Sequence, residues 1–188
     1  MNKKFSTKKI VLTALLAALV VVGSALRITL PLDIAGTTSF HLGNIMCALS
    51  GLLLGPWWGG LAAGLGSAIY DMTNPLYISE AWITFLFKGA YGLMAGLVVF
   101  IGHKGQRTYV WDLLGTLAGA VTYAVLYLAK SFFYNGLLVA GLEVAPALAT
   151  VVGKLPATIF NAVVALIFAP ILSIAIRKAL EKNHLSID

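Results

Sequence analysis

Residues 40–72 read FHLGNIMCALSGLLLGPWWGGLAAGLGSAIYDM, in which two apolar runs, Phe40–Leu54 and Trp57–Met72, are separated by Gly55-Pro56. Proline cannot continue a helix that precedes it, and a Gly-Pro pair is typical of a turn. The stretch therefore predicts two antiparallel helices joined by a tight turn. Each run is somewhat shorter than the roughly 20 residues that cross a bilayer as a helix.

Further apolar runs flank this pair, and the chain as a whole is 60% hydrophobic and 11% charged over 188 residues. That composition lies outside the range of soluble globular domains. The other runs are Ile10–Leu30, Ala81–Gly102, Val110–Tyr134 and Leu148–Ile176. Together the runs use almost the whole length. We therefore expect an all-α integral membrane protein with six transmembrane helices, in which residues 1–188 form a single domain.

The basic residues predict how the chain is oriented in the membrane. Nine of the 13 Lys and Arg residues lie in three segments that a six-helix chain places on one side. The positive-inside rule makes that side cytoplasmic, with the N and C termini there. The net charge of +6 therefore reflects orientation in a lipid bilayer, and we expect no nucleic-acid partner. The nine residues are Lys3, Lys4, Lys8, Lys9, Lys104, Arg107, Arg177, Lys178 and Lys182, and the opposite side carries Asp33, Asp71, Glu80 and Glu143.

Three lysines, Lys88, Lys130 and Lys154, lie inside runs that otherwise read as transmembrane helices. A charged side chain in the bilayer costs roughly 2.5–3.5 kcal/mol on insertion scales, so such residues usually serve a function. At the rise of an α-helix, Lys88 and Lys154 lie about 12 Å and 9 Å from the outer ends of their helices. Lys130 lies about 28 Å from the inner end of its helix. All three fall in the outer half of the membrane, which predicts a polar pocket there.

Other polar and aromatic residues fall at helical spacing from these lysines or at the outer ends of the remaining helices. Amide and imidazole groups can hydrogen-bond a ligand, and aromatic faces suit a planar ring. We therefore predict a substrate-binding pocket. Its candidate residues are Lys88, Lys130, Lys154, Asn161, Tyr91, Tyr127, His41, Asn44, Asp71 and Trp82.

Several of these residues also have a structural interpretation. Lys130 and Lys154 are close enough to the interface for their ammonium groups to reach the lipid headgroups along an apolar stem. His41 can equally be a hydrogen-bonded structural histidine. Asp71 can simply neutralise a nearby cation, and Glu80 can cap the N-terminus of a helix.

The sequence contains neither a Gly-x-x-x-x-Gly-Lys-Ser/Thr loop for ATP nor a His-Glu-x-x-His zinc motif. We therefore expect that the chain does not bind ATP in the Walker manner and has no zinc site of this type. Small residues recur at four-residue spacing, as in Ala14 and Ala18. Such spacing lets helix backbones approach closely, either within one bundle or against another membrane protein.

The stretch from Leu42 to Asp71 resembles the second-to-third-helix signature of the substrate-binding (S) components of energy-coupling factor transporters, the vitamin importers of bacteria and archaea. The length of the chain and the number of apolar runs agree with that family. The residues that carry the resemblance are Leu42-Gly43-Asn44, Leu52-Leu53-Leu54-Gly55-Pro56-Trp57-Trp58-Gly59-Gly60, Gly64 and Asp71, together with Ala14-Leu15-Leu16-Ala17-Ala18, which is similar to the family's Ala-x-x-x-Ala pattern.

The resemblance implies a binding protein and not an enzyme, with no metal and no cofactor of its own. Such a multi-pass protein of the plasma membrane captures a vitamin-like molecule from outside with high affinity. The resemblance also implies partners: a transmembrane coupling subunit and two ABC ATPases, which use ATP. The protein would topple in the membrane to release its cargo inside. Ala14 and Ala18 would then contact the coupling subunit, and the outer loop Leu32–Thr38 would act as a lid.

The identity of the ligand is open at this point. The residue patterns that we associate with the riboflavin, thiamine and biotin branches of the family are not evident in the sequence. Several cations in the predicted pocket favour a ligand with a carboxylate, a phosphate or polar ring acceptors, such as a pantothenate-, folate- or nucleobase-like molecule. Two other classes of protein are open alternatives: a stand-alone channel or facilitator, and a structural membrane subunit without a ligand.

Overall fold

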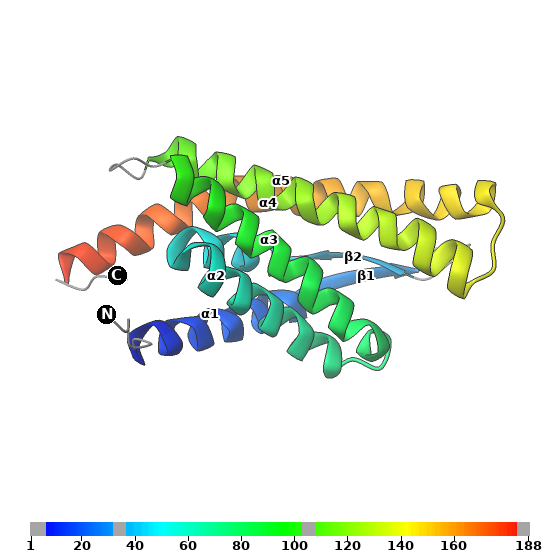
Figure 1. The fold of residues 1–188 in the computed structure, drawn as a ribbon, viewed down its shortest axis with the longest axis horizontal. Coiled ribbons are helices and arrows are strands. Elements are labelled where there is room, and N and C mark those ends of the chain that lie inside the picture. Colours follow the sequence, from blue (N-terminus) through cyan, green and yellow to red (C-terminus); the bar gives the residue numbers. More distant parts are fainter. Residues whose placement is uncertain (1–6, 32–36, 103–107, 184–188) are drawn as a thin grey trace.

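The computed structural model describes residues 7–31, 37–102 and 108–183. Long helices make up most of it, together with one β hairpin and two shorter helical segments (Figure 1). Within the described residues, five helical stretches are long and apolar enough to cross a membrane. In chain order the elements are α1 (Thr7–Ala25), β1 (Arg27–Pro31), β2 (Thr37–His41), α2 (Gly43–Met72), η1 (Ile78–Glu80), α3 (Ala81–Gly102), α4 (Tyr109–Lys130), η2 (Ser131–Val139) and α5 (Val144–Lys182).

Helix α2 folds back on itself at Gly55. This residue has φ 78° and ψ −174°, a conformation that glycine adopts without a steric penalty. The Cys47 Sγ and Ser67 Oγ atoms lie 3.6 Å apart, whereas a straight helix would separate these residues by about 30 Å. The predicted turn at Gly55-Pro56 is therefore present. Residues 43–54 and 56–72 form two antiparallel arms.

The first predicted helix is too long at its C-terminal end. Helix α1 ends at Ala25, and β1 pairs with β2 in an antiparallel hairpin in which Arg27 lies opposite His41. The prediction of a purely α-helical fold was therefore wrong in this region. Hydropathy alone does not distinguish a helix from a strand, and the β-branched residues that favour a strand, such as Ile28 and Thr29, were read only as apolar or neutral positions.

The predicted lid loop, Leu32–Thr38, is only partly described. Thr37 and Thr38 belong to β2, and residues 32–36 lie outside the described residues. The second apolar run likewise begins at Gly43 instead of Phe40, because Phe40 is in β2.

The last predicted outer loop, residues 135–147, is mostly helical. Helix α4 continues into η2, a π-helix, and α5 begins at Val144. Three residues that can end a helix, Gly136, Gly141 and Pro146, lie in this segment. Only Gly141 has the positive φ, 60°, that ends the helical path, while Pro146 lies in the first turn of α5, where proline is tolerated.

Glycines spaced four residues apart bring the helices of the bundle together. A Cβ on Gly60 would lie 2.9 Å from the Gly89 carbonyl oxygen of α3, and one on Gly119 of α4 would lie 2.7 Å from the Tyr91 carbonyl oxygen. Contacts this close leave no room for a side chain, so these positions serve packing within the chain. The corresponding pair on α1 differs, because Ala14 and Ala18 are both exposed.

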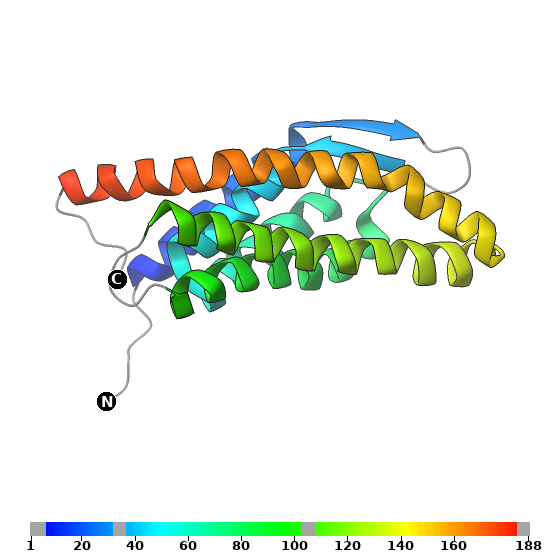
Figure 2. The same cartoon turned by 90° about the horizontal axis from the view of Figure 1, so that it is seen from above.

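The arrangement of the helices gives the molecule two distinct ends. The start of α1, the end of α3, the start of α4 and the end of α5 lie at one end in both views (Figure 1, Figure 2). The hairpin lies toward the opposite end, where α4 gives way to α5 (Figure 2). The chain thus enters and leaves the bundle at the same end.

Candidate functional site

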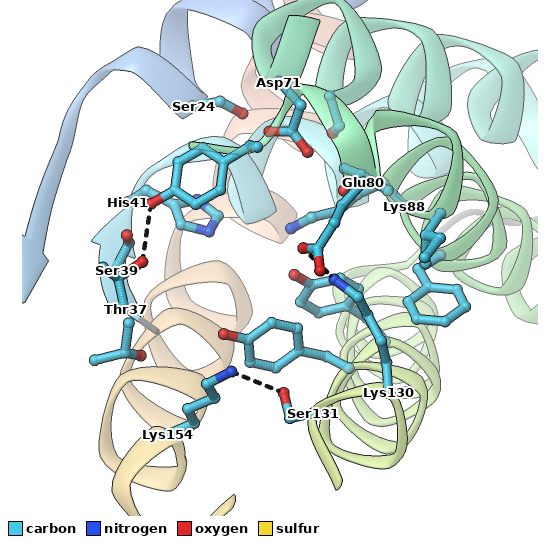
Figure 3. Close-up of a pocket in the computed structure, with 18 of the residues that line it drawn as sticks. Ser24, Thr37, Ser39, His41, Asp71, Glu80, Lys88, Lys130, Ser131 and Lys154 are labelled. Atoms are coloured by element: carbon cyan, nitrogen blue, oxygen red, sulfur yellow. Dashed lines mark hydrogen bonds and ion pairs between the residues drawn. The ribbon is translucent and has the colours of Figure 1, made fainter. Parts of the chain in front are cut away.

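A cavity of about 260 Å³ lies between the β hairpin and helices α2, α3, α4 and α5 (Figure 3). Most of the polar side chains that the bundle does not expose converge on it. Among the residues that line it are Arg27, Thr37, Thr38, Ser39, His41, Asn44, Asp71, Tyr77, Glu80, Lys88, Tyr123, Tyr127, Lys130, Ser131, Asn135, Lys154, Thr158 and Asn161.

The structure brings most of the predicted site residues to this cavity. The ones that line it are Lys88, Lys130, Lys154, Asn161, Tyr127, His41, Asn44 and Asp71. They come from elements far apart in the sequence, which agrees with the prediction of one polar level shared by several helices. Their role in binding remains a prediction.

Two of the predicted residues do not line the cavity. Trp82 is 62% exposed on the outer surface of α3, so its assignment to the pocket was wrong. It precedes Lys88 by six residues, which at about 100° per residue places the two side chains on different faces of the helix. Tyr91 is fully buried, and its ring lies behind that of Tyr123 with 6.0 Å between the ring centroids.

Lys88 lies in the wall between α2 and α3 and is 4% exposed. Its ammonium group donates a hydrogen bond to Asn44 Oδ1. The Nζ atom also lies 3.8 Å from the centroid of the Tyr123 ring, a cation–π contact. Both of these partners are neutral.

Lys154 of α5 occupies the other side of the cavity and is 6% exposed. Its ammonium group donates to Ser131 Oγ over 3.2 Å and lies 5.6 Å from the centroid of the Tyr127 ring. These partners are again neutral. In Figure 3 the Lys154 side chain points into the cavity, toward Ser131.

Lys130 differs from the other two lysines because it has an acidic partner. Its Nζ atom lies 2.5 Å from Glu80 Oε2, and Glu80 Oε1 accepts a hydrogen bond from Asn135 Nδ2 at 2.7 Å. Glu80 is therefore part of the cavity wall, a role that sequence reasoning missed. The alternative that Lys130 and Lys154 extend to the lipid headgroups does not hold, because both ammonium groups are bound inside the protein.

The aromatic wall is a stack of tyrosines. Tyr123 and Tyr127, one helical turn apart on α4, stack with 5.7 Å between centroids and 17° between ring planes. The flat faces of this stack contact the two lysines without an acidic partner. The wall can therefore hold a planar group beside a charged one.

The hairpin closes the cavity on its remaining side. The Asn161 side chain accepts a hydrogen bond from the His41 backbone N–H at 3.0 Å and donates one to the Ser39 carbonyl at 2.8 Å. The Arg27 guanidinium lies over the Tyr70 and Tyr77 rings, 4.2 Å and 5.1 Å from their centroids. The sequence reading placed Arg27 on a helix and therefore could not place it opposite α2 and η1.

His41 is uncharged in this setting. The Gly43 backbone N–H donates to His41 Nδ1 over 3.2 Å, which requires a free lone pair on that nitrogen. Burial lowers the pKa of His41 well below its usual range, and the nearby charges of Lys88 and Arg27 lower it further. His41 therefore adds hydrogen-bonding capacity to the cavity and no positive charge.

The chain has helices apolar enough to cross a bilayer, and they surround an internal polar cavity. These two features define the class of membrane proteins with an internal site for a small molecule. Residues 4–178 match the family described as the ECF-type riboflavin transporter S component. The match covers nearly the whole chain, so the chain belongs to this family, and the resemblance to S components seen in the sequence is confirmed. It is accordingly a multi-pass protein of the plasma membrane.

A curated relative comes from Pyrococcus woesei and carries the description "Uncharacterized protein in gap 3'region". It is 33% identical over 119 residues, which cover 63% of this chain and 74% of the relative. The family match is to the riboflavin-type branch, which the sequence reading did not see. The match extends over most of the length of the chain and is not confined to the residues that line the cavity.

Proposed function

We propose that this chain is the substrate-capture subunit of an ECF-type ABC importer. It binds a vitamin or vitamin-like small molecule from outside the cell in the cavity between the hairpin and α2–α5. It then delivers the molecule by associating with a transmembrane coupling subunit and two ABC ATPases, which use ATP. The chain itself binds no cofactor and performs no chemistry. The observation that carries the proposal is a polar cavity of about 260 Å³ within the helix bundle of a member of the S component family.

In this proposal the chain crosses the membrane six times, with the two arms of α2 as the second and third crossings. The basic residues at the start of α1 and the end of α5 then lie in the cytoplasm, since these segments share one end of the molecule (Figure 1). The cavity falls in the outer half. A cysteine introduced at Thr73 should react with a membrane-impermeant maleimide on intact cells, and one at Lys178 only after the membrane is opened; the reverse pattern contradicts the topology.

The α1 face that carries Ala14 and Ala18 is the proposed contact with the coupling subunit. Both alanines are exposed, while Leu16, Ala17 and Val20 are buried against the bundle. Small exposed residues one turn apart allow a helix of another protein to approach closely.

Mass spectrometry of small molecules that co-purify with the chain, followed by uptake assays, tests the proposal. The purified chain alone should bind the molecule saturably. Uptake of that molecule into vesicles should require the coupling subunit, the ATPases and ATP. Solute leakage without ATPases would favour the channel, and a chain that neither binds a small molecule nor associates with a coupling subunit would favour the structural subunit.

The family description names riboflavin, which makes a flavin one candidate substrate. The cavity of about 260 Å³ lies just below the roughly 300–1,000 Å³ of typical ligand pockets. Its size therefore favours a small molecule. The charges on its walls carry more information about the substrate than its volume does.

A further inference from the structure

The cavity holds more positive than negative charge. Four cationic side chains line it, Arg27, Lys88, Lys130 and Lys154, against two carboxylates, Asp71 and Glu80. Lys130 and Glu80 form an ion pair and cancel each other. Arg27 is held over tyrosine rings. Arg27, Lys88 and Lys154 then share one remaining carboxylate, Asp71, so the cavity carries a net positive charge.

Neither of these two lysines has an acidic partner within 4.0 Å in the part of the chain that the structure describes. Lys88 donates to the Asn44 amide and Lys154 to the Ser131 hydroxyl. Both side chains are more than nine-tenths buried. An ammonium group removed from water is costly unless an opposite charge compensates it, and hydrogen bonds to neutral oxygens compensate it only in part. These two buried ammonium groups therefore lack a directly bonded counter-charge.

The two ammonium groups flank one aromatic surface. Lys88 lies over Tyr123 and Lys154 over Tyr127, and these two rings are stacked on each other. Figure 3 shows Lys88 and Lys154 reaching into the same cavity from different helices. A flat molecule placed along the tyrosines would meet a cation near each end of the stack.

We infer, on the basis of the proposed function, that the substrate is a small organic anion with a planar ring, whose acidic group or groups bind Lys88 and Lys154. A carboxylate or a phosphate fits this chemistry. A neutral molecule of the same shape leaves both ammonium groups without a counter-charge and binds more weakly. Riboflavin, which is uncharged at neutral pH, is by this criterion a poorer ligand than its phosphate ester.

Matched pairs of small molecules test the inference with the purified full-length chain. Each pair shares a planar ring and differs in charge: nicotinate and nicotinamide, which have nearly the same shape, and riboflavin 5′-phosphate and riboflavin, which differ by the phosphate group. Thermal unfolding followed by tryptophan fluorescence detects binding, and calorimetry measures affinity. In at least one pair the anion should bind about tenfold or more tightly than the neutral molecule.

Two lysine variants and one acidic variant test whether the preference for an anion depends on Lys88 and Lys154. Lys88→Gln and Lys154→Gln should each bring the affinities of the anion and its neutral partner close together. Asn44→Asp places a carboxylate beside Lys88 and should weaken anion binding by about tenfold without lowering the unfolding temperature. Lys178→Gln removes a charge from the exposed end of α5 and should change nothing.

The inference is overturned if, in every pair that binds, the neutral molecule binds as tightly as its anionic partner, or if no anion of the panel binds at millimolar concentration. It is also overturned if the anion preference survives in both lysine variants. High-affinity binding and ATP-dependent uptake of a neutral compound would overturn it while the proposed function stands. Anion binding without any ATP-dependent uptake would overturn the proposed function and leave the charge preference in place.

Discussion

At the scale of single residues, the three intramembrane lysines have three different environments. Lys88 binds Asn44, Lys154 binds Ser131, and Lys130 pairs with Glu80. The lysines line one cavity but differ in their electrostatic surroundings. Lys130 is neutralised by the Glu80 carboxylate, whereas Lys88 and Lys154 have only neutral hydrogen-bond partners.

His41 makes stability depend on pH. In the folded chain its pKa is lowered by burial and then by the charges of Lys88 and Arg27, while in the unfolded chain it stays near about 6.5. As the pH falls through about 6.5 the unfolded chain takes up a proton that the folded chain does not, so stability present above that pH is lost below it.

We therefore expect the unfolding temperature in detergent to fall between pH 7.5 and pH 5, and to fall less in His41→Gln, with the difference beginning near about pH 6.5. Glutamine cannot take up a proton in this range but keeps an amide oxygen near the Gly43 N–H. Identical pH profiles for the wild-type chain and the variant would show that His41 does not titrate differently in the two states.

At the scale of elements, the Asn161 amide is one of several contacts between the β hairpin and the bundle, together with the Phe40–Phe160 ring pair and the Arg27 guanidinium over Tyr70. Asn161 of α5 binds both the N–H of His41 and the carbonyl of Ser39, as a neighbouring strand would. Each such hydrogen bond contributes about 0.5–1.5 kcal/mol, and each buried backbone group left unpaired costs more.

Replacing Asn161 with leucine removes both hydrogen bonds to the hairpin backbone while keeping a similar side-chain volume, so the hairpin should be bound less firmly to α5. We expect faster amide hydrogen exchange in residues 37–41, a lower unfolding temperature and weaker ligand binding. Thr29→Val is the control, because it removes an exposed hairpin hydrogen bond, Thr29 to Ser39, and leaves Asn161 in place. Unchanged exchange at His41 in Asn161→Leu would exclude this docking role.

Far from the cavity, α4 and α5 are joined by an ion pair between Asp112 and Arg177. Asp112 is fully buried, and its Oδ1 atom, like one Arg177 nitrogen, has no hydrogen-bond partner within the described residues. The pair lies between the start of α4 and the end of α5, the end of the bundle opposite the hairpin (Figure 1).

Arg177→Met should therefore cost about 3–5 kcal/mol, because it leaves the buried Asp112 carboxylate unpaired. The double variant Asp112→Leu with Arg177→Met removes both charges and should recover much of that loss. A double-mutant cycle based on chemical or thermal unfolding measures the coupling between the two residues. Additive effects of the two substitutions would show that the pair does not stabilise the chain.

At the scale of the whole molecule, exposure distinguishes the small residues that pack within the bundle from those that can contact a partner protein. The glycine pairs on α2, α3 and α4 are covered by neighbouring helices, whereas Ala14 and Ala18 face outward. This face is therefore free to meet another membrane protein.

Ala18→Trp should leave ligand binding unchanged and reduce uptake about tenfold or more, because the indole keeps the partner helix at a distance. Binding to the purified chain and ATP-dependent uptake with the coupling subunit and ATPases are the two measurements. Val121→Trp, at another exposed apolar position on α4, is the matched control and should affect neither. Normal uptake by Ala18→Trp would remove α1 from the proposed interface.

The sequence alone determined where most of the apolar helices lie, the turn at Gly55-Pro56 and the meeting of the three lysines at one polar level of the bundle. Hydropathy, proline geometry and helical rise are local properties. The sequence did not determine the β hairpin. Ile28 and Thr29 are compatible with a helix or a strand, and only the pairing with β2 selects the strand. The sequence reading misplaced Trp82 for a similar reason: the rotation of a helix depends on the neighbours that it packs against.

Only the tertiary structure decided which charges cancel. Glu80 was as available as Asp71 to any of the lysines on sequence grounds, and the fold pairs it with Lys130. Partner choice depends on distances between side chains far apart in the sequence, and Coulomb energies change steeply over a few ångströms. That is why the polar level of the bundle was predictable, while the neutral hydrogen-bond partners of Lys88 and Lys154 were not.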